Sequence, residues 1–94
     1  MTNAILLDAK DNVATCTAAA KAGDKIKIIG GDEIFCVEDI PIWHKVALKE
    51  ICKGDKIFKY GEIIGEASSD IAKGGWVSHE NIFSVPRDYE SELI

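Results

Sequence analysis

The chain has 94 residues, of which 47% are hydrophobic and 29% charged, and its formal net charge is −5. This length allows one hydrophobic core and predicts one domain over residues 1–85, and the ordinary globular composition excludes wholesale disorder. The acidic balance argues against a nucleic-acid binder, which needs a basic face to displace phosphate counterions. No apolar run approaches the ~20 residues that span a bilayer, so no membrane segment is expected.

The start of the chain predicts a strand followed by a short helix. The apolar run Ala4–Leu7 is typical of a strand. Asp11 or Asn12 is then expected to cap a helix over residues 13–20, because the alanines there favour helix. Gly23 follows where a left-handed residue commonly ends a helix.

The rest of the chain predicts short strands. Lys25–Ile28 alternates with period two, and Gly30-Gly31-Asp32 predicts a hairpin turn to a returning strand at residues 34–37. Beyond Pro41, apolar stretches of three to five residues are separated by a glycine turn roughly every ten residues, which favours a compact all-β unit. The fold class expected from the pattern is mainly β with one short helix.

Two segments of the second half share a pattern, and the end of the chain has none. Residues 51–57 and 71–77 both read Ile-x-Lys-Gly-x-x-apolar, which predicts two similarly shaped turns packed against each other. The acidic C-terminal tail over residues 86–94 is expected to fray or to dock on a partner.

The cysteines indicate a reducing compartment. Cys16, Cys36 and Cys52 are widely spaced and form no CxxC pair, so they predict small buried hydrophobes rather than a zinc or redox site. Residues 1–8 lack the basic and apolar regions of a signal peptide. A cytoplasmic protein is therefore expected.

A set of motifs is more specific than composition. In chain order it comprises Asp11-Asn12-Val13-Ala14, His44-Lys45-Val46-Ala47-Leu48, Ile51, Gly54, Lys59-Tyr60-Gly61, Ile64-Gly65, Ala67, Asp70-Ile71 and Gly74. Together these residues resemble the SAF domain of the altronate and galactarate dehydratase family, which the small subunit of sulfolactate sulfo-lyase also shares. The resemblance extends from about Ile5 to Asn81.

The resemblance implies a β-clip (SAF-like) fold that serves as the small subunit or N-terminal domain of a sugar-acid dehydratase. In that family a large catalytic subunit carries most of the machinery, a hexonate or hexarate loses water, and divalent iron or another divalent metal is typical. Such an elimination needs a base for the proton α to the carboxylate and an acid or metal for the leaving group. The isolated chain is expected to be the non-autonomous part of the lyase and to bind no metal by itself. Sulfolactate sulfo-lyase, which releases sulfite, is the alternative enzyme.

One loop departs from the family pattern. Many members carry His-x-His immediately before the asparagine that matches Asn81, whereas here Ser78 and Glu80 stand at those positions with His79 between them. Galactarate-type members also lack the histidine pair and have a tryptophan where Trp76 stands. The resemblance implies substrate contacts at Ser78, His79 and Asn81.

His44 is the catalytic candidate, because imidazole titrates near neutrality and the family motif begins at this residue. The alternative is an imidazole that hydrogen-bonds the backbone and fixes a turn. Neighbouring side chains of an extended chain point to opposite faces, so only one of His44 and Lys45 is expected to face a site. Lys45, Lys59 and Tyr60 are substrate-binding candidates that would offer ammonium and phenol groups to a carboxylate. For Lys59 and Tyr60 the alternative is a solvated lysine and a tyrosine at the edge of the core.

A metal site is a further alternative for the histidines. His44, His79 and Glu80 would supply two imidazoles and a carboxylate, the ligand set of a non-haem iron facial triad. Adjacent residues rarely ligate one ion together, so an exposed turn is the preferred interpretation of His79 and Glu80, and no metal site is assigned.

The charge is spread unevenly along the chain. Residues 1–43 hold four lysines and seven acidic residues, and residues 82–94 hold one arginine and three acidic residues. Residues 44–81, which carry the motifs, hold six lysines and six acidic residues. Local charge sets the potential in a cleft, so a small acid remains an allowed ligand.

The partners expected are therefore a large catalytic dehydratase subunit, a sugar acid and a second copy of the chain in a homo-oligomer, with no nucleic acid and no membrane. Two non-catalytic alternatives stay open. One is a SAF module that binds a ligand or partner, and the other is an oligomerisation domain that uses unpaired strand edges.

Overall fold

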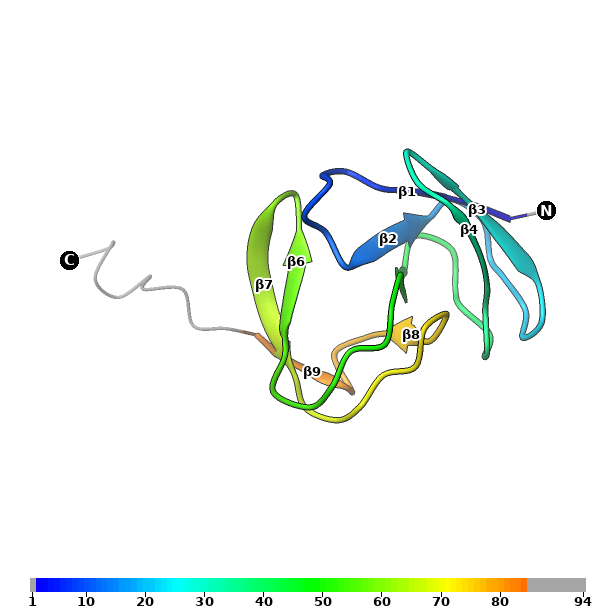
Figure 1. Cartoon of the computed structure of the whole chain (residues 1–94). Coiled ribbons are helices and arrows are strands. Elements are labelled where there is room, and N and C mark those ends of the chain that lie inside the picture. The colour runs from blue at the N-terminus through cyan, green and yellow to red at the C-terminus, as the bar shows by residue number, and fades with distance from the viewer. Residues whose placement is uncertain (1, 85–94) are drawn as a thin grey trace.

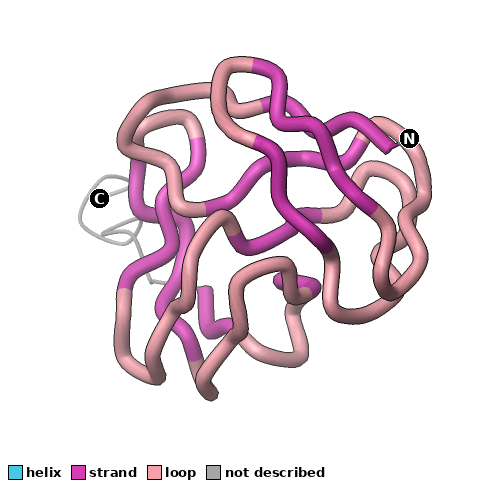
Figure 2. The backbone as a smooth tube through the Cα atoms, turned by 45° about the vertical axis from the view of Figure 1, so that its right-hand side comes forward, coloured by secondary structure: helices cyan, strands magenta, loops and turns pink. Residues whose placement is uncertain are grey.

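The computed structural model describes residues 2–84 (Figure 1). Over that range the chain forms strands joined by loops and turns, without a helix (Figure 2). The strands are β1 (Thr2–Ile5), β2 (Val13–Cys16), β3 (Lys25–Ile29), β4 (Glu33–Phe35), β5 (Lys45–Ala47), β6 (Lys56–Lys59), β7 (Glu62–Ala67), β8 (Trp76–Val77) and β9 (Ile82–Ser84). The predicted tail over residues 86–94 lies outside the described residues. No helix long and apolar enough to cross a membrane occurs in residues 2–84.

The strands form two sheets. The larger has the order β4-β3-β1-β2-β5-β8, in which β1 and β3 are parallel and all other neighbours antiparallel. The smaller is the antiparallel sheet β6-β7-β9. In Figure 1 the smaller sheet stands on the left, β1, β3 and β4 on the right, and β2 between them. The mainly-β prediction is confirmed.

Strands β2 and β5 form a wall between two hydrophobic clusters. Ala14 and Val46 belong to the first cluster, to which β1, β3 and β4 contribute, whereas Val13 and Ala47 belong to the second, to which β6 and β7 contribute. Because successive side chains of a strand point to opposite faces, each of these two strands supplies both cores. The first cluster comprises Ala4, Ala14, Cys16, Ala20, Ile26, Ile28, Ile34, Cys36, Ile40 and Val46, and the second Val13, Ala47, Ile51, Ile57, Ala67, Ile71 and Val77.

This double burial explains why the predicted helix over residues 13–20 is wrong. Val13–Cys16 is strand β2, paired with β1 on one side and β5 on the other. A strand buried on both faces shows no alternation of apolar and polar residues, so periodicity does not separate it from a buried helix. Pairing on both edges outweighs the helix preference of alanine, which is a weak bias.

The hairpin predicted around Gly30-Gly31-Asp32 is confirmed, because β3 and β4 pair antiparallel across it. In β3 the isoleucines Ile26 and Ile28 are buried and the flanking residues exposed, as the alternation indicates. The first strand, in contrast, lies at Thr2–Ile5, two residues earlier than the predicted Ala4–Leu7.

Asp11 and Asn12 do not cap a helix but fasten the β6–β7 hairpin to the rest of the chain. The Asn12 amide Nδ2 donates to the carbonyl of Lys56 (2.8 Å), and its Oδ1 accepts from the backbone N–H of Phe58 (2.8 Å). The Asp11 carboxylate accepts from both N–H groups of Tyr60-Gly61, at 3.0 and 2.8 Å. Two buried polar side chains thus replace a strand partner along β6.

The chain contains an internal repeat. Gly-Asp-Lys-Ile occurs at residues 23–26 and again at residues 54–57, and the structure around the two copies is the same. The similar turns predicted at residues 51–57 and 71–77 do pack together, through the bridge between Ile51 and Ile71. Three contacts recur in the two copies. The bridge Ala20–Ile40 matches the bridge Ile51–Ile71. The hydrogen bond from Ala22 N to Asp39 Oδ1 (2.9 Å) matches that from Lys53 N to Asp70 Oδ1 (2.8 Å), and the bond from Gly23 N to the Cys36 carbonyl (2.8 Å) matches that from Gly54 N to the Ala67 carbonyl (2.9 Å).

Candidate functional site

His44 lies at the start of β5 and is bound to an indole. Trp76 on the neighbouring strand β8 donates from Nε1 to His44 Nδ1 at 3.0 Å, and the two rings meet edge-on with their centroids 5.4 Å apart. An indole N–H is a donor only, so Nδ1 is the acceptor and the neutral imidazole carries its proton on Nε2. His44 therefore presents an N–H donor at Nε2.

Lys45 points to the other face of β5. It is half-buried, and its Cα partners are Thr15 on β2 and Val77, a member of the second cluster. Burial lowers the pKa of Lys45 from its ordinary 10.5, and the charge of Lys59 lowers that pKa further. The expectation that His44 and Lys45 face different ways is confirmed, because His44 contacts Trp76, which packs on the first cluster.

A polar group without a partner lies beside Lys45. The hydroxyl Oγ1 of Thr15 is buried and makes no hydrogen bond within residues 2–84. Directly opposite residues of an antiparallel pair have their Cβ atoms about 4.5–5.5 Å apart on one face of the sheet. Lys45 and Thr15 therefore offer an ammonium group and an unsatisfied hydroxyl side by side, and such a group is normally completed by a ligand or a water molecule.

Lys59 and Tyr60 join this group from the end of β6. Lys59 is half-buried, and its Nζ lies 5.1 Å from the centre of the Tyr60 ring. Tyr60 is 64% exposed and has a φ of 59°, and the bond from its N–H to Asp11 holds it there. The ammonium of Lys59 is near enough to Lys45 to lower the pKa of that residue, and a solvated Lys59 stays the alternative interpretation.

The turn at residues 78–81 is held by its own polar side chains. Asn81 Oδ1 accepts from Ser78 N (2.8 Å), and its Nδ2 donates to the carbonyl of Trp76 (2.7 Å). The Ser78 hydroxyl accepts from the N–H of Glu80 at 3.2 Å. Ser78 and Asn81 thus fix the turn next to the indole that holds His44, while His79 and Glu80 are exposed.

The candidate residues therefore form two groups and not one. His44, Trp76 and the turn at residues 78–81 lie together, and Lys45, Lys59 and Tyr60 form the other group with Thr15. Within residues 2–84 no three His, Cys, Asp or Glu side chains lie close enough to hold a metal ion, so the triad of two histidines and a glutamate is not assembled. The described residues do not fit a divalent iron site.

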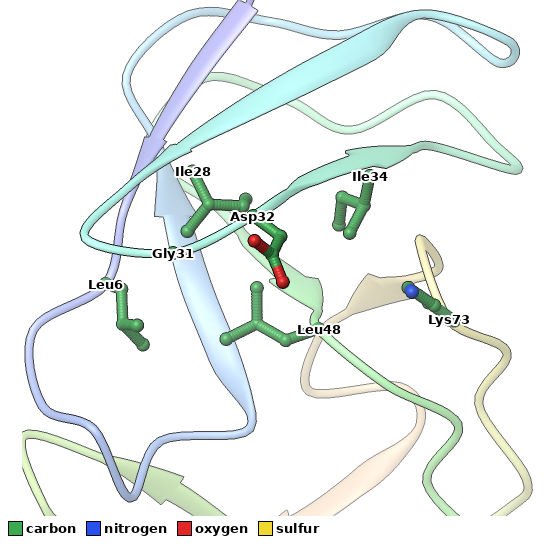
Figure 3. A pocket seen from close by; sticks show the side chains of 7 residues that line it. All are labelled: Leu6, Ile28, Gly31, Asp32, Ile34, Leu48 and Lys73. Atoms are coloured by element: carbon green, nitrogen blue, oxygen red, sulfur yellow. The ribbon is translucent and has the colours of Figure 1, made fainter.

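Two cavities lie among the described residues, away from both groups. The first, of about 170 Å³, is shown in Figure 3, with apolar side chains from β3, β4 and the segments after β1 and β5 around it. Its lining is Leu6, Ile28, Gly31, Asp32, Ile34, Leu48 and Lys73. The second, of about 330 Å³, is lined by Lys10, Asn12, Lys49, Asp55, Lys56 and Phe58. The candidate site residues are thus not enclosed by either cavity.

The cysteines offer no nucleophile in the cores. Cys16 and Cys36 are buried, as expected, whereas Cys52 is exposed. Burial, and after it the neighbouring Cys36, together raise the pKa of Cys16 to about 11. A thiol with so high a pKa is inert at neutral pH.

Two functional features were missed by sequence reasoning. Trp76 was considered only as a mark of galactarate-type relatives, and no short-range pattern indicates that its indole meets His44 from another strand. Thr15 was placed in the predicted helix, where its hydroxyl would have no special role. Both depend on pairing across β2, β5 and β8, which sequence spacing does not reveal.

A family model described as the altronate/galactarate dehydratase SAF domain matches residues 2–85. The chain belongs to this family.

Three relatives show how much of each protein the chain spans. An altronate dehydratase of Escherichia coli is 36% identical over 77 residues, which are 82% of this chain and 15% of the relative. A galactarate dehydratase (L-threo-forming) of the same organism is 36% identical over 74 residues, 77% of this chain and 13% of the relative. The (2R)-sulfolactate sulfo-lyase subunit alpha of Paracoccus pantotrophus is 51% identical over 43 residues, 46% of this chain and 64% of that subunit. The chain thus spans a small part of the two dehydratases.

Proposed function

We propose that this chain is the SAF-domain part of a sugar-acid dehydratase, a carbon–oxygen lyase of the cytoplasm. It forms one wall of a substrate pocket, and a large catalytic chain completes that pocket. The observation that carries this proposal is that none of its candidate residues lines either of the two cavities described above, so the chain alone does not enclose them. The matched dehydratases support it, because the aligned region is 15% of one and 13% of the other.

The lysine group binds the carboxylate of the acid. The positive charge of Lys59 opposes that of Lys45, and an anion bound between the two ammonium groups relieves this repulsion. Lys45 supplies one charge and Lys59 the other. A charge-assisted bond to a carboxylate is stronger than a neutral one, so this group fixes the orientation of the acid.

His44, which faces away from the lysine group, acts as a hydrogen-bond donor to a part of the sugar acid remote from the carboxylate that the lysines bind. Its Nδ1 is held by Trp76, so Nε2–H is the group that reaches a hydroxyl or carboxylate oxygen of the acid. The proton α to the carboxylate is removed by a base of the large chain, because Nδ1 of His44 is occupied by the Trp76 indole and His79 is exposed on the turn at residues 78–81. Any divalent metal of the assembled enzyme is likewise held by the large chain, since this chain lacks a ligand cluster over residues 2–84.

Sulfolactate is the second candidate substrate. It is favoured by the 51% identity over 43 residues to the sulfo-lyase subunit alpha, of which the aligned region makes up 64%. Both acids carry a carboxylate next to a hydroxyl-bearing carbon, so the same lysine group serves both. They differ in the leaving group, which is water for a sugar acid and sulfite for sulfolactate.

The products separate these reactions. The assembled complex, made with the large dehydratase chain of the source organism, is incubated with altronate, galactarate or sulfolactate, and 2-oxo acid and sulfite are both measured. Formation of a 2-oxo acid from a sugar acid without sulfite supports the dehydratase, whereas sulfite from sulfolactate supports the sulfo-lyase. Binding of these acids without any product would contradict both and leave a non-catalytic module.

The role of His44 is tested in the same complex. His44→Ala is expected to lower kcat about tenfold to a hundredfold, because a lost hydrogen bond to a reacting oxygen removes roughly 1.5–3 kcal/mol. The control is Lys27→Ala, whose parent side chain is exposed on β3 and belongs to neither candidate group. An undiminished kcat in His44→Ala would remove His44 from the mechanism.

A further inference from the structure

Four turns of the chain have one and the same construction. Each follows a bridge residue, and each is closed by a hydrogen bond from the N–H of its fourth residue to the carbonyl of its first. The third residue of each turn has a positive φ, as a type II turn requires, which is why glycine is favoured there. These third residues are Gly23 (φ 91°), Trp43 (φ 68°), Gly54 (φ 93°) and Gly74 (φ 84°).

Trp43 is the exception in this series. The repeat pairs it with Gly74: the N–H of Trp43 donates to the carbonyl of Cys16 at 2.8 Å, and that of Gly74 donates to the carbonyl of Ala47 at 2.8 Å. The turn is therefore built equally well by glycine, and a bulky residue with positive φ is a strained one. Backbone strain of this kind persists where it serves function.

The Trp43 side chain does not pack in either hydrophobic cluster, so packing within the described residues does not offset this strain. It is 64% exposed and belongs to neither hydrophobic cluster. Its neighbour Ile42 is 46% exposed, and Phe35 and Val37, earlier in the same segment, are 62% and 55% exposed. The segment from residue 35 to residue 43 thus exposes four large apolar side chains, and Ile42 and Trp43 are adjacent in the same turn.

We propose that Trp43 is the anchor by which this chain docks on the large catalytic chain. This inference rests on the proposed function and adds the surface that assembles the complex. The size of the relatives supports this occupant, because 85% of the altronate dehydratase lies outside the matched region and offers a large surface on which this domain can dock. A tryptophan next to an aliphatic side chain is the residue type that dominates binding energy at protein interfaces.

A small ligand fits this position less well than a protein does. Small molecules bind in concave sites that bury most of their surface. Trp43 lines neither of the two cavities described above, and a residue exposed at the corner of a turn has no walls around it. A flat protein surface covers such a side chain without needing a cavity on this chain.

The test replaces Trp43 by the residue that stands in the other three turns. Trp43→Gly removes the anchor and the strain together, so the isolated chain is expected to unfold at the same urea concentration as the wild type or at a higher one. Affinity for the large dehydratase chain of the source organism, measured by calorimetry, is expected to fall about tenfold or more. The matched control is Phe83→Ala on β9, which removes an aromatic side chain of similar exposure, 62%, and is expected to leave the affinity unchanged.

Four results would overturn the proposal. A lower unfolding midpoint for Trp43→Gly would make the indole a structural group, and an unchanged affinity would exclude it from the interface. An unchanged affinity together with a raised KM for the acid would place the Trp43 side chain at the substrate. If Trp43→Gly instead dissociates a homo-oligomer formed by this chain alone, the surface that covers Trp43 belongs to a second copy. Failure of the wild-type chain to bind the large chain is a different result, since it contradicts the proposed function itself.

Discussion

Asn12 is expected to hold the β6–β7 hairpin, and with it the lysine group, in place. The side chain is 6% exposed and makes two hydrogen bonds of 2.8 Å to the backbone of β6, at Lys56 and Phe58. Asn12→Ala removes both bonds and leaves a carbonyl and an N–H of that strand without their partner. Each lost bond contributes about 1 kcal/mol, and each buried group left unpaired adds roughly 1–3 kcal/mol.

The surroundings reduce that second contribution. Asn12 and Phe58 both line the cavity of about 330 Å³, so water can reach the two backbone groups once the amide is gone. We therefore expect a loss of about 2–3 kcal/mol in the free energy of unfolding. For a domain of this length that loss lowers Tm by roughly 10–20 °C.

Urea and thermal unfolding, followed by circular dichroism, measure this loss. The control is Asn3→Ala, because Asn3 is an exposed asparagine on β1 and surface substitutions stay within about 0.5 kcal/mol. A loss for Asn12→Ala no larger than that of the control would refute the view that the amide fastens the hairpin.

Two further predictions concern the turns and the lysine group. Gly74→Ala is expected to lower the free energy of unfolding by about 3 kcal/mol, because the added Cβ would meet the Phe35 carbonyl. Gly54→Ala has open space around its Cβ and is expected to lower it by about 1 kcal/mol. Urea unfolding midpoints compare the two variants, and equal losses would contradict the packing argument. Lys45→Met is expected to stabilise the chain at pH 7, because the folded state lowers the pKa of Lys45. Between the lowered pKa and 10.5, Lys45 is protonated in the unfolded chain but has lost its proton in the folded one. The free energy of unfolding of the wild type therefore rises with pH over that window, and the advantage of Lys45→Met shrinks. If Lys45→Met has the same free energy of unfolding as the wild type at pH 7, the burial of the Lys45 ammonium does not destabilise the folded chain.

The sequence predicted the fold class well where side chains alternate. Strand β3 shows period two, and the glycines of the β3–β4 hairpin mark its turn, so both were found. Strand β2 was not, because its two buried faces erase the alternation. The repeated Gly-Asp-Lys-Ile at residues 23–26 and 54–57, 31 residues apart, indicates the internal repeat. The pattern shared by residues 51–57 and 71–77 instead indicates a different pair of turns.

The candidate site could be predicted only in part. The family motif indicated His44, Lys45 and Lys59. His44 and Lys45 lie on different sides of β5, and Lys59 approaches Lys45 from β6. The partners Trp76 and Thr15 come from strands far apart in sequence, so no local pattern indicates them. Trp43 has the clearest missed signal, since a sequence comparison of the four turns shows tryptophan where the others have glycine.

The central claim is that this chain completes a lyase pocket on a large catalytic chain. The most direct test titrates this chain into a fixed amount of the large chain and follows the rate of 2-oxo acid formation from altronate and from galactarate. The account predicts no turnover by this chain alone, and a rate that rises with added chain until the two are equimolar. Turnover by this chain alone, or a full rate from the large chain without it, would contradict the claim.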